Sequence, residues 1–297
     1  MKRLRSLGES IIERLVQLAG ILAIVFVVLI LAFLLRDALP VLKTVSLGAM
    51  LGGDRWSPTA EPPKFGFLPM ILGSLYVTVG ALILAVPLGL ACAVFISEVA
   101  PPAWREALKP AVELLAAVPS VIFGFLGLLL IGPWLQRVLD LPVGQFAALG
   151  SLLLAFMALP TIVSVSEDAL RAVPRVLRHN SLALGATEWQ TIRGVTFPAA
   201  RSGLLAAVLL GMGRAIGETM TVLMVCGNAP IIPQGLGAFL GPVRTMTATI
   251  ASEMGEVAVG SSHYSALFMI GLLLLLITLA VNLGAEALVR RTAVRAK

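Results

Sequence analysis

The chain has 297 residues, a net charge of +6 and a mean hydropathy of +0.98; 58% of its residues are hydrophobic and only 13% are charged. A soluble globular domain is about half apolar and about one quarter charged, so this composition excludes that class and indicates a protein embedded in a bilayer. The basic residues lie in short runs between apolar stretches rather than along one polar face. They therefore indicate membrane topology, and we expect no nucleic-acid partner.

The two cysteines do not point to a metal site. Cys92 and Cys226 both fall within or at the end of apolar stretches, which argues against an extracellular disulfide framework. No CxxC pattern and no cluster of His and Cys residues offers metal ligands. We expect both cysteines to be small core residues, and we expect neither a metal nor a cofactor.

Six apolar stretches are long enough, at about 20 residues, to cross a hydrocarbon core of about 30 Å. The first is expected over residues 15–35, after a tail at 1–14 and before a loop at 36–65. It is longer than a signal-peptide core and lacks a small-residue cleavage site after it, so an uncleaved anchor is predicted. The other five spans are expected within 66–97, 114–134, 141–166, 203–227 and 265–285.

The distribution of Lys and Arg predicts the orientation. If the N-terminus is inside, fifteen of the 22 Lys and Arg residues fall on the inner side and six on the outer side, with Arg214 inside the fifth span. The positive-inside rule then places both termini, including a tail at 290–297, and the loop at 171–200 in the cytoplasm. The six outer residues are Arg36, Lys43, Arg55, Lys64, Arg137 and Arg244.

Two outer loops and three prolines stand out. The loops at 36–64 and 228–263 each contain a Gly- and Pro-rich run that we expect to be irregular, and each could dock a partner or serve as a spacer. Pro87, Pro119 and Pro160 lie inside predicted spans, where each must release a backbone carbonyl. We expect kinked helices that face an interior cavity.

The inner loop has the sequence of two short helices joined by a glycine turn. Leu177 to Leu184 has helical spacing and ends at Gly185, the residue type that most easily adopts the left-handed conformation closing a helix. Thr187 then stands at an N-cap with Gln190 three residues later, a capping box that opens a second helix. Pro198 marks the re-entry into the membrane. Together these features predict a rigid elbow.

Trp189 and Ile192 are expected near one face of the elbow as an apolar knob. Such a knob could be hidden against the chain's own surface or presented to a soluble partner. The loop is basic and regular and lies between two apolar runs, which favours the partner.

The loop resembles the EAA loop of ABC-importer permeases, in which Glu-Ala-Ala is followed by a glycine and then by Ile, any residue, Leu and Pro. Gly185 and Pro198 match in separation, Val195 and Phe197 stand for Ile and Leu, and His179-Asn180-Ser181 replaces Glu-Ala-Ala. The charged contact that the glutamate makes to the ATPase in the family is therefore not carried over. The resemblance implies an ATPase-coupling role for His179, Ser181, Gly185, Ala186, Thr187, Glu188, Trp189, Ile192 and Pro198.

Longer motifs narrow the resemblance. The segments at 65–78, 117–125, 158–174 and 211–228 are similar to those of phosphate-specific (Pst) permeases, and the similarity extends over about residues 9–291. The long first outer loop, with WSPTAEPPKFG, is closer to the PstC type than to the PstA type.

This resemblance implies a fold, a function and partners. The fold is all-α and polytopic, with six transmembrane helices and a type I importer (MetI-like) permease domain at 66–289. This domain includes a coupling loop at 171–200 with a cytoplasmic coupling helix. The function is passage of inorganic phosphate, driven by ATP hydrolysis in a partner. The implied partners are a PstA-type sister permease, a PstB-type ATPase dimer, a PstS-type periplasmic phosphate-binding protein and membrane lipid.

Arg214 and Glu218 lie four residues apart in the fifth span, where opposite charges on one helical face can pair. A charge at the centre of a membrane helix costs about 2.5 to 3.5 kcal/mol on insertion scales, so such residues usually face a bundle interior or water. The pair could simply lock two helices together. Alternatively, Arg214 offers its planar N–H donors to an oxyanion while Glu218 holds it in place.

Other polar residues in the spans are weaker candidates for the substrate path. Thr219 and Thr221 could add hydroxyl donors. Ser120 and Thr161 each follow a proline and could bond the freed carbonyls or line the path. Glu113 is expected to open the third span, where a carboxylate complements the helix dipole.

Three competing functions remain. An enzyme is disfavoured because the chain has no Walker A pattern and no HExxH, and because its two histidines are predicted on opposite sides of the membrane. A channel or secondary carrier would not need the elbow. The nearest alternative is a permease for another oxyanion, such as molybdate or sulfate.

Overall fold

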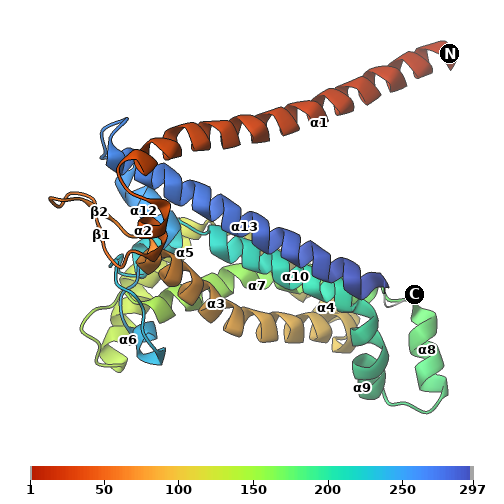
Figure 1. The fold of residues 1–297 in the computed structure, drawn as a ribbon. Coiled ribbons are helices and arrows are strands. Elements are labelled where there is room, and N and C mark those ends of the chain that lie inside the picture. The colour runs from red at the N-terminus through yellow and green to blue at the C-terminus, as the bar shows by residue number, and fades with distance from the viewer. Residues whose placement is uncertain (1, 295–297) are drawn as a thin grey trace.

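The computed structural model describes residues 2–294, which fold almost entirely into helices (Figure 1). Six helical stretches are long and apolar enough to cross a membrane, as the sequence predicts, so the chain is a multi-pass membrane protein. The candidate spans are Ile12–Lys43, Leu68–Val99, Ser120–Val138, Ala147–Arg171, Glu188–Gly217 and Ser262–Gly284.

Helix α7 (Ala147–Arg171) is the central helix of the bundle. It packs along α3 (Leu68–Val94) and α10 (Phe197–Gly217), and 61% of its most apolar window is buried, against none of that of α1 (Lys2–Ala38). The long helix α13 (Ser262–Val294) packs against α10 and α1. In Figure 1, α1 reaches out from the bundle, so its apolar sides are free to contact lipid or another subunit.

The two chain ends continue membrane helices. The tail expected at 1–14 is helical from Lys2 onward, and α13 extends through Val294, five residues into the tail expected at 290–297. Residues 1 and 295–297 lie outside the described residues.

Short elements gather at one end of the bundle, here called the hairpin end (Figure 1). Neither of the two long loops predicted to be outer is as irregular as the sequence suggests, because each carries small helices or strands between its turns. These elements are η1 (Leu39–Lys43), α2 (Leu47–Gly52), the antiparallel strands β1 (Trp56–Ser57) and β2 (Lys64–Phe65), η5 (Leu236–Leu240) and α12 (Met246–Glu253).

A carboxylate joins the two long loops that the sequence predicts to be outer. Glu253 accepts a hydrogen bond from Trp56 Nε1 at 3.1 Å, pairs with Arg244 at 2.6 Å and contacts His263 Nε2 at 2.7 Å. Trp56 belongs to the first loop, whereas the other three residues belong to the second loop or the start of α13. The loops are therefore held together as one unit.

The third span begins later than predicted. The segment expected to start it, around residue 114, belongs to a separate amphipathic helix, α4 (Pro102–Ala117), whose Leu114 is 70% exposed. Pro119 lacks an N–H and forces Val118 into an extended conformation, which ends α4. The span consists of α5 (Ser120–Leu126), η3 (Gly127–Ile131) and α6 (Gly132–Val138).

Three wide π turns precede prolines. They are η2 (Phe95–Val99), η3 and η4 (Ile192–Thr196), and each ends two residues before a proline, at Pro101, Pro133 and Pro198. In each, the residue before the proline donates its N–H to the carbonyl five residues back instead of four. The extra residue gives the proline ring room, and the helix can continue in η3 and η4.

The fifth span therefore starts earlier than predicted. Because η4 absorbs Pro198, α9 (Glu188–Thr191), η4 and α10 run on as one helix, and Pro198 does not begin a new one. The span also ends differently, since α10 stops at Gly217 and a separate helix, α11 (Met220–Val225), follows. Helix α8 (Arg175–Ala183) precedes α9, and both lie at the opposite end from the hairpin, here called the elbow end (Figure 1).

Candidate functional site

Two interrupted helices meet in the bundle. The first break, at Val118 and Pro119, separates α4 from α5, and the second, at Glu218, separates α10 from α11. Helices α5 and α11 pack directly against each other. Gly124 permits this approach, because an added Cβ would lie 2.7 Å from Met224 Sδ. We call this the helix-break region.

Hydrogen bonds fix the helix-break region from three helices. Thr221 Oγ1 donates to the Ser120 carbonyl at 3.0 Å, which ties α11 to α5. The Glu218 carboxylate accepts the Thr221 N–H at 3.2 Å, so it satisfies one of the open donors at the start of α11. Thr247 Oγ1, on α12, donates to the Glu218 carbonyl at 2.9 Å. Hydrogen bonds therefore hold the break in place and connect it to α12 at the hairpin end.

The predicted pair between Arg214 and Glu218 is wrong. Since α10 ends at Gly217, Glu218 leaves the helical face on which a spacing of four would place it. Its carboxylate bonds α11 instead. Arg214 is exposed and has no ion pair or hydrogen bond with any residue in the part of the chain that the structure describes. A lone cation in a span is costly in lipid, so this face requires water or another protein surface.

The four hydroxyl residues differ in what they contact. Thr221 is fully buried and bonded, so it positions helices and does not line an open path. Thr219 makes only a long contact, 3.4 Å, to the Gly217 carbonyl. Ser120 and Thr161 are half-buried, and neither hydroxyl bonds another of the described residues. The alternative in which these two satisfy carbonyls freed by prolines is therefore wrong.

The predicted glycine turn of the elbow is confirmed. Gly185 has φ +88°, a left-handed value that side chains disfavour. The Gly185 N–H donates to the Leu182 carbonyl at 3.0 Å, and the Ala186 N–H donates to the Ser181 carbonyl at 3.2 Å. These two bonds form a Schellman motif, which satisfies the last carbonyls of α8.

The predicted capping box is also confirmed. The Thr187 N–H donates to Gln190 Oε1 at 2.8 Å, and the Gln190 N–H donates to Thr187 Oγ1 at 3.3 Å. A contact of 2.9 Å between the hydroxyls of Ser181 and Thr191 joins α8 to α9. Side-chain and backbone bonds therefore set the angle between the two helices.

The apolar knob differs from the prediction. Ile192 is only 8% exposed, because it packs into the bundle at the start of η4, whereas Trp189 is 64% exposed. Leu184, at the tip of the turn, is 90% exposed. His179 and Glu188 are exposed as well. The exposed apolar surface of the elbow includes Leu184 and Trp189, together with Val176, Leu177 and Leu182 of α8.

A cluster of ion pairs joins α4 to the end of α7, near the elbow. Glu167 is 2% exposed, and its carboxylate lies 2.8 Å from Lys109 Nζ and in contact with the Arg171 guanidinium. Asp168 also pairs with Lys109, at 3.2 Å. Within residues 2–294, no group of three His, Cys, Asp or Glu side chains is placed to hold a metal ion. We call Lys109, Glu167, Asp168 and Arg171 the Glu167 cluster.

Two further arginines fill gaps that prolines leave in the backbone. Arg105 donates to the carbonyls of Ile96 and Ser97, both at 2.8 Å, which lose their helical partners because residues 101 and 102 are prolines. Arg178 donates to the Leu170 carbonyl at 2.7 Å, four residues before Pro174, and pairs with Glu98 at 2.8 Å. These side chains anchor α4 and α8 to the bundle.

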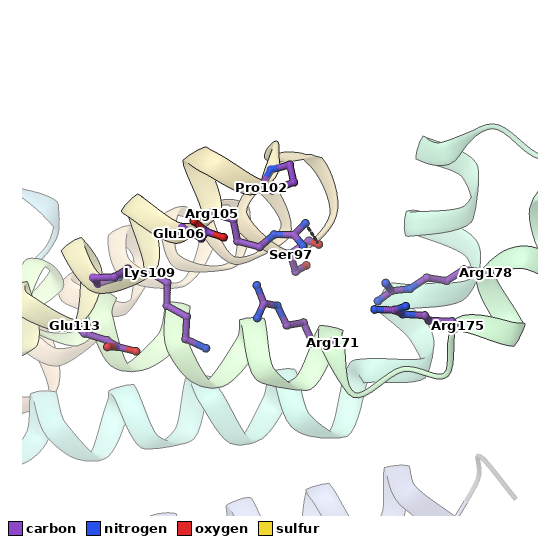
Figure 2. Close-up of a pocket in the computed structure, with 10 residues that line it drawn as sticks. Ser97, Pro102, Arg105, Glu106, Lys109, Glu113, Arg171, Arg175 and Arg178 are labelled. Atoms are coloured by element: carbon purple, nitrogen blue, oxygen red, sulfur yellow. Dashed lines mark hydrogen bonds between the residues drawn. The ribbon is translucent and has the colours of Figure 1, made fainter.

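These charged residues surround a cavity of about 640 Å³ at the elbow end (Figure 2). The Glu167 carboxylate raises the pKa of Lys109 above its ordinary 10.5 by hydrogen bonding, and Asp168 adds to this effect, while burial opposes it. The cavity is lined by Ser97, Pro102, Arg105, Glu106, Lys109, Pro110, Glu113, Arg171, Arg175 and Arg178.

Residues 85–294 match the family described as binding-protein-dependent transport system inner membrane component. The chain belongs to this family. The match contains the helix-break region, the elbow and the Glu167 cluster, so all three are features of a transport permease.

Curated relatives refine the membership. The permease is 35% identical to the phosphate transport system permease protein PstC of Mesorhizobium japonicum, over 92% of this chain and 87% of that protein. It is 36% identical to PstC 1 of Mycobacterium tuberculosis over 76% of this chain and 73% of that protein. It is also 43% identical to the probable ABC transporter permease protein YqgH of Bacillus subtilis, over 75% and 71%. The permease is thus of the PstC type.

Solved structures agree on the fold. A chain of the MetNI methionine ABC transporter, in an inward-facing conformation, superposes with a TM-score of 0.58 at 18% identity, covering 75% of this permease and 96% of that chain. A chain of a bacterial ABC transporter for alginate import gives a TM-score of 0.57 at 17% identity, over 76% and 79%. The predicted MetI-like permease fold is confirmed.

Sequence reasoning missed the Glu167 cluster in this permease. Glu167 and Arg171 are spaced by four residues at the end of a span, which is a pairing signal, but Lys109 lies 58 residues away. The prediction for Glu113 is also wrong. Glu113 lies near the C-terminal end of α4 and not at the start of a span helix, so it does not complement the dipole at a helix N-terminus.

Proposed function

We propose that the chain is the PstC-type subunit of an ATP-driven importer and forms, with a sister permease, a path for inorganic phosphate. The names of the PstC relatives and the extent of the similarity support phosphate. The observation that carries the proposal is Arg214, an exposed and unpaired guanidinium next to a break in a membrane helix. Its planar donors suit a phosphate oxyanion, and discontinuous helices are typical of transporter binding sites.

The sister permease completes the path. The face that carries Arg214 is exposed in the single chain, and lipid would be a costly neighbour for a charge. A PstA-type subunit packed on this face would place the guanidinium in a hydrated path between the two proteins. One arginine balanced by no carboxylate binds an anion, and a single contact of this kind still permits release.

The substrate-path residues divide into two roles. Arg214 contacts phosphate directly, and Thr219, Ser120 and Thr161 add hydroxyl donors along the path. Glu218 and Thr221 hold α11 in position through the bonds described above. Glu218 therefore acts on the structure of the break and not on the arginine.

The elbow is proposed to bind a PstB-type ATPase dimer in the cytoplasm. The positive-inside count supports a cytoplasmic elbow end, and Figure 1 shows both chain ends on the same side as α8 and α9. Leu184 and Trp189 provide the apolar contact, and the Schellman turn and capping box make the elbow stiff enough to transmit motion. The hairpin end then faces outward, where a PstS-type binding protein would dock on the loops joined by Glu253.

The test is uptake of labelled phosphate into vesicles that hold the complete importer, with sulfate, molybdate and arsenate as competitors. Arg214→Gln is expected to lower uptake at least about tenfold while the complex still copurifies, because a charge-assisted contact contributes about 1.5 to 3 kcal/mol. Arg137→Gln, an exposed cation at the far end of α6, is the matched control and should transport normally. Wild-type uptake by Arg214→Gln would refute the site, and stronger competition by molybdate or sulfate than by phosphate would refute the substrate.

A further inference from the structure

The cavity at the elbow end has a wall of arginines and an opposite wall with carboxylates. Arg171 extends from the end of α7, and Arg175 and Arg178 extend from α8 toward the same space (Figure 2). Helix α4 provides the other wall, which carries Glu106 and Glu113 together with the cations Arg105 and Lys109. Arg105 is bonded to the carbonyls of Ile96 and Ser97, and Lys109 is bonded to Glu167. Among the described residues, the unused N–H donors therefore lie on the arginine wall and the unpaired carboxylates on the α4 wall.

The arginine wall has donors to spare. Arg178 is occupied by Glu98 and the Leu170 carbonyl. Arg171 uses its Nε on Glu167, which leaves its terminal nitrogens without a bond to other residues in the described range. Arg175 is exposed and pairs with none of the described residues. Two guanidinium groups thus offer unused N–H donors to the cavity.

The buried carboxylate of Glu167 orients part of the arginine wall in advance. Glu167, at 2% exposure, holds Lys109 and Arg171, so the Arg171 side chain is fixed before any ligand arrives. A guanidinium that is already positioned loses little conformational entropy when it binds an anion. The geometry of the wall is part of the fold and does not depend on Arg214 or the helix-break region.

Glu106 and Glu113 decide which anion fits. Neither pairs with a cation among the described residues, so both present carboxylate oxygens to the cavity. A carboxylate repels a fully ionised anion but accepts a hydrogen bond from a P–OH group. Hydrogenphosphate carries both the oxyanion that the arginines need and the P–OH that a carboxylate accepts. Sulfate and the phosphodiester of a lipid headgroup lack this proton.

We propose that this cavity is a binding site for free hydrogenphosphate, separate from the helix-break region. Arg171 and Arg175 bind its ionised oxygens, and Glu106 or Glu113 accepts its P–OH. An ion bound in this way joins α7 to α8, the first helix of the elbow. The site goes beyond the proposed function, since it requires neither transport nor a particular transported ion.

The experiment is calorimetric titration of the purified full chain in detergent with inorganic phosphate, with sulfate at equal ionic strength, and with phosphatidylglycerol in mixed micelles. Saturable phosphate binding is expected in the wild type, with at least about tenfold weaker binding in Arg175→Gln. Arg14→Gln removes an exposed charge of α1 outside the cavity and should bind as the wild type does. Arg175 has no partner to lose, so its variant is expected to fold.

A second variant tests the P–OH contact. Glu106→Gln and Glu113→Gln together should narrow the preference for phosphate over sulfate by about tenfold, because the amide no longer repels sulfate. The proposal is overturned if phosphate does not saturate, if Arg175→Gln binds like the wild type, or if sulfate or phosphatidylglycerol binds as well as phosphate does. If the chain binds phosphate as expected but the complete importer does not take up phosphate, only the proposed function is refuted. If the importer takes up phosphate but the chain shows no such binding, only this site is refuted.

Discussion

The Glu167 cluster and the helix-break region both place charges next to membrane helices, but they balance them differently. In the Glu167 cluster, two cations share one buried carboxylate, and Asp168 assists at the rim. In the helix-break region, the carboxylate of Glu218 turns to a backbone N–H, and Arg214 is left without a partner. The first region is electrically complete within one chain, and the second is not.

This difference separates architecture from function. A buried carboxylate with two cations holds α4 on α7 and needs nothing else. An unpaired guanidinium in a span does not stabilise the fold of the isolated chain. Its position is explained instead by an interaction with a second subunit or with the substrate. The comparison predicts that changes in the Glu167 cluster alter stability, whereas changes at Arg214 alter transport.

The largest stability effect is expected for Glu167→Gln. Loss of the charge leaves Lys109 and Arg171 without their buried partner and should lower the free energy of unfolding by about 2 kcal/mol. This loss of unfolding free energy is smaller than that expected for a fully buried ion pair, since both cations are partly exposed. Denaturant unfolding of the purified protein in detergent measures it.

Glu113→Gln is the matched control, because Glu113 is exposed on the same helix as Lys109 and pairs with none of the described residues. It should change the free energy of unfolding by less than about 0.5 kcal/mol. Equal losses in the two variants would show that the Glu167 cluster does not hold the fold together.

Two double-mutant cycles compare the regions directly. The cycle of Lys109→Gln with Glu167→Gln should give a coupling energy of about 1 kcal/mol, because the two groups lie 2.8 Å apart. The cycle of Arg214→Gln with Glu218→Gln should give less than about 0.3 kcal/mol, because the helix ends between them. A coupling of similar size in both cycles would restore the pair that the spacing of four residues suggests.

Local sequence signals predicted part of the structure well. Gly185 and the Thr187 to Gln190 capping box depend only on residues within a few positions, and both are confirmed with their hydrogen bonds. The six spans follow from length and apolar composition alone. Each of these features is decided by the chain's own nearest neighbours and its solvent.

Helix interruptions and long-range pairs could not be read in the same way. Periodicity predicts a third span that runs back across Pro119 and a fifth span that runs through Glu218. In the structure α4 ends before Pro119, and α10 ends at Gly217, after which the Glu218 backbone is extended. Conversely, the sequence places the re-entry into the membrane at Pro198, but the π turn η4 accommodates this proline and the helix continues through it. Lys109, the partner of Glu167, lies 58 residues away in the stretch between the second and third predicted spans, so no local pattern indicates the pair.

Glu218 gives a smaller effect that tests its revised role. Glu218→Ala removes the acceptor for the Thr221 N–H at the start of α11 and should lower the free energy of unfolding by about 0.5 to 1 kcal/mol. Glu218→Gln keeps an acceptor oxygen and should cost less than about 0.3 kcal/mol. If the charge itself mattered, as in a pair with Arg214, Gln would be as harmful as Ala.

The smallest effect is the pH dependence of the Glu167 cluster. Because Glu167 raises the pKa of Lys109 in the folded protein above 10.5, the folded state holds this proton more tightly than the unfolded state does. The resulting stabilisation is fully present below pH 10.5 and is lost as the pH rises through the raised pKa. The difference in unfolding free energy between the wild type and Lys109→Gln should therefore be constant from about pH 7 to about pH 10 and shrink as the pH rises through the raised pKa. Denaturant titrations at several pH values measure this difference, and a gap that stays constant above the raised pKa would mean that the charge of Lys109 does not contribute to folding. With Arg214→Gln in place of Lys109→Gln, the difference should not change over the same range, because a guanidinium keeps its proton throughout.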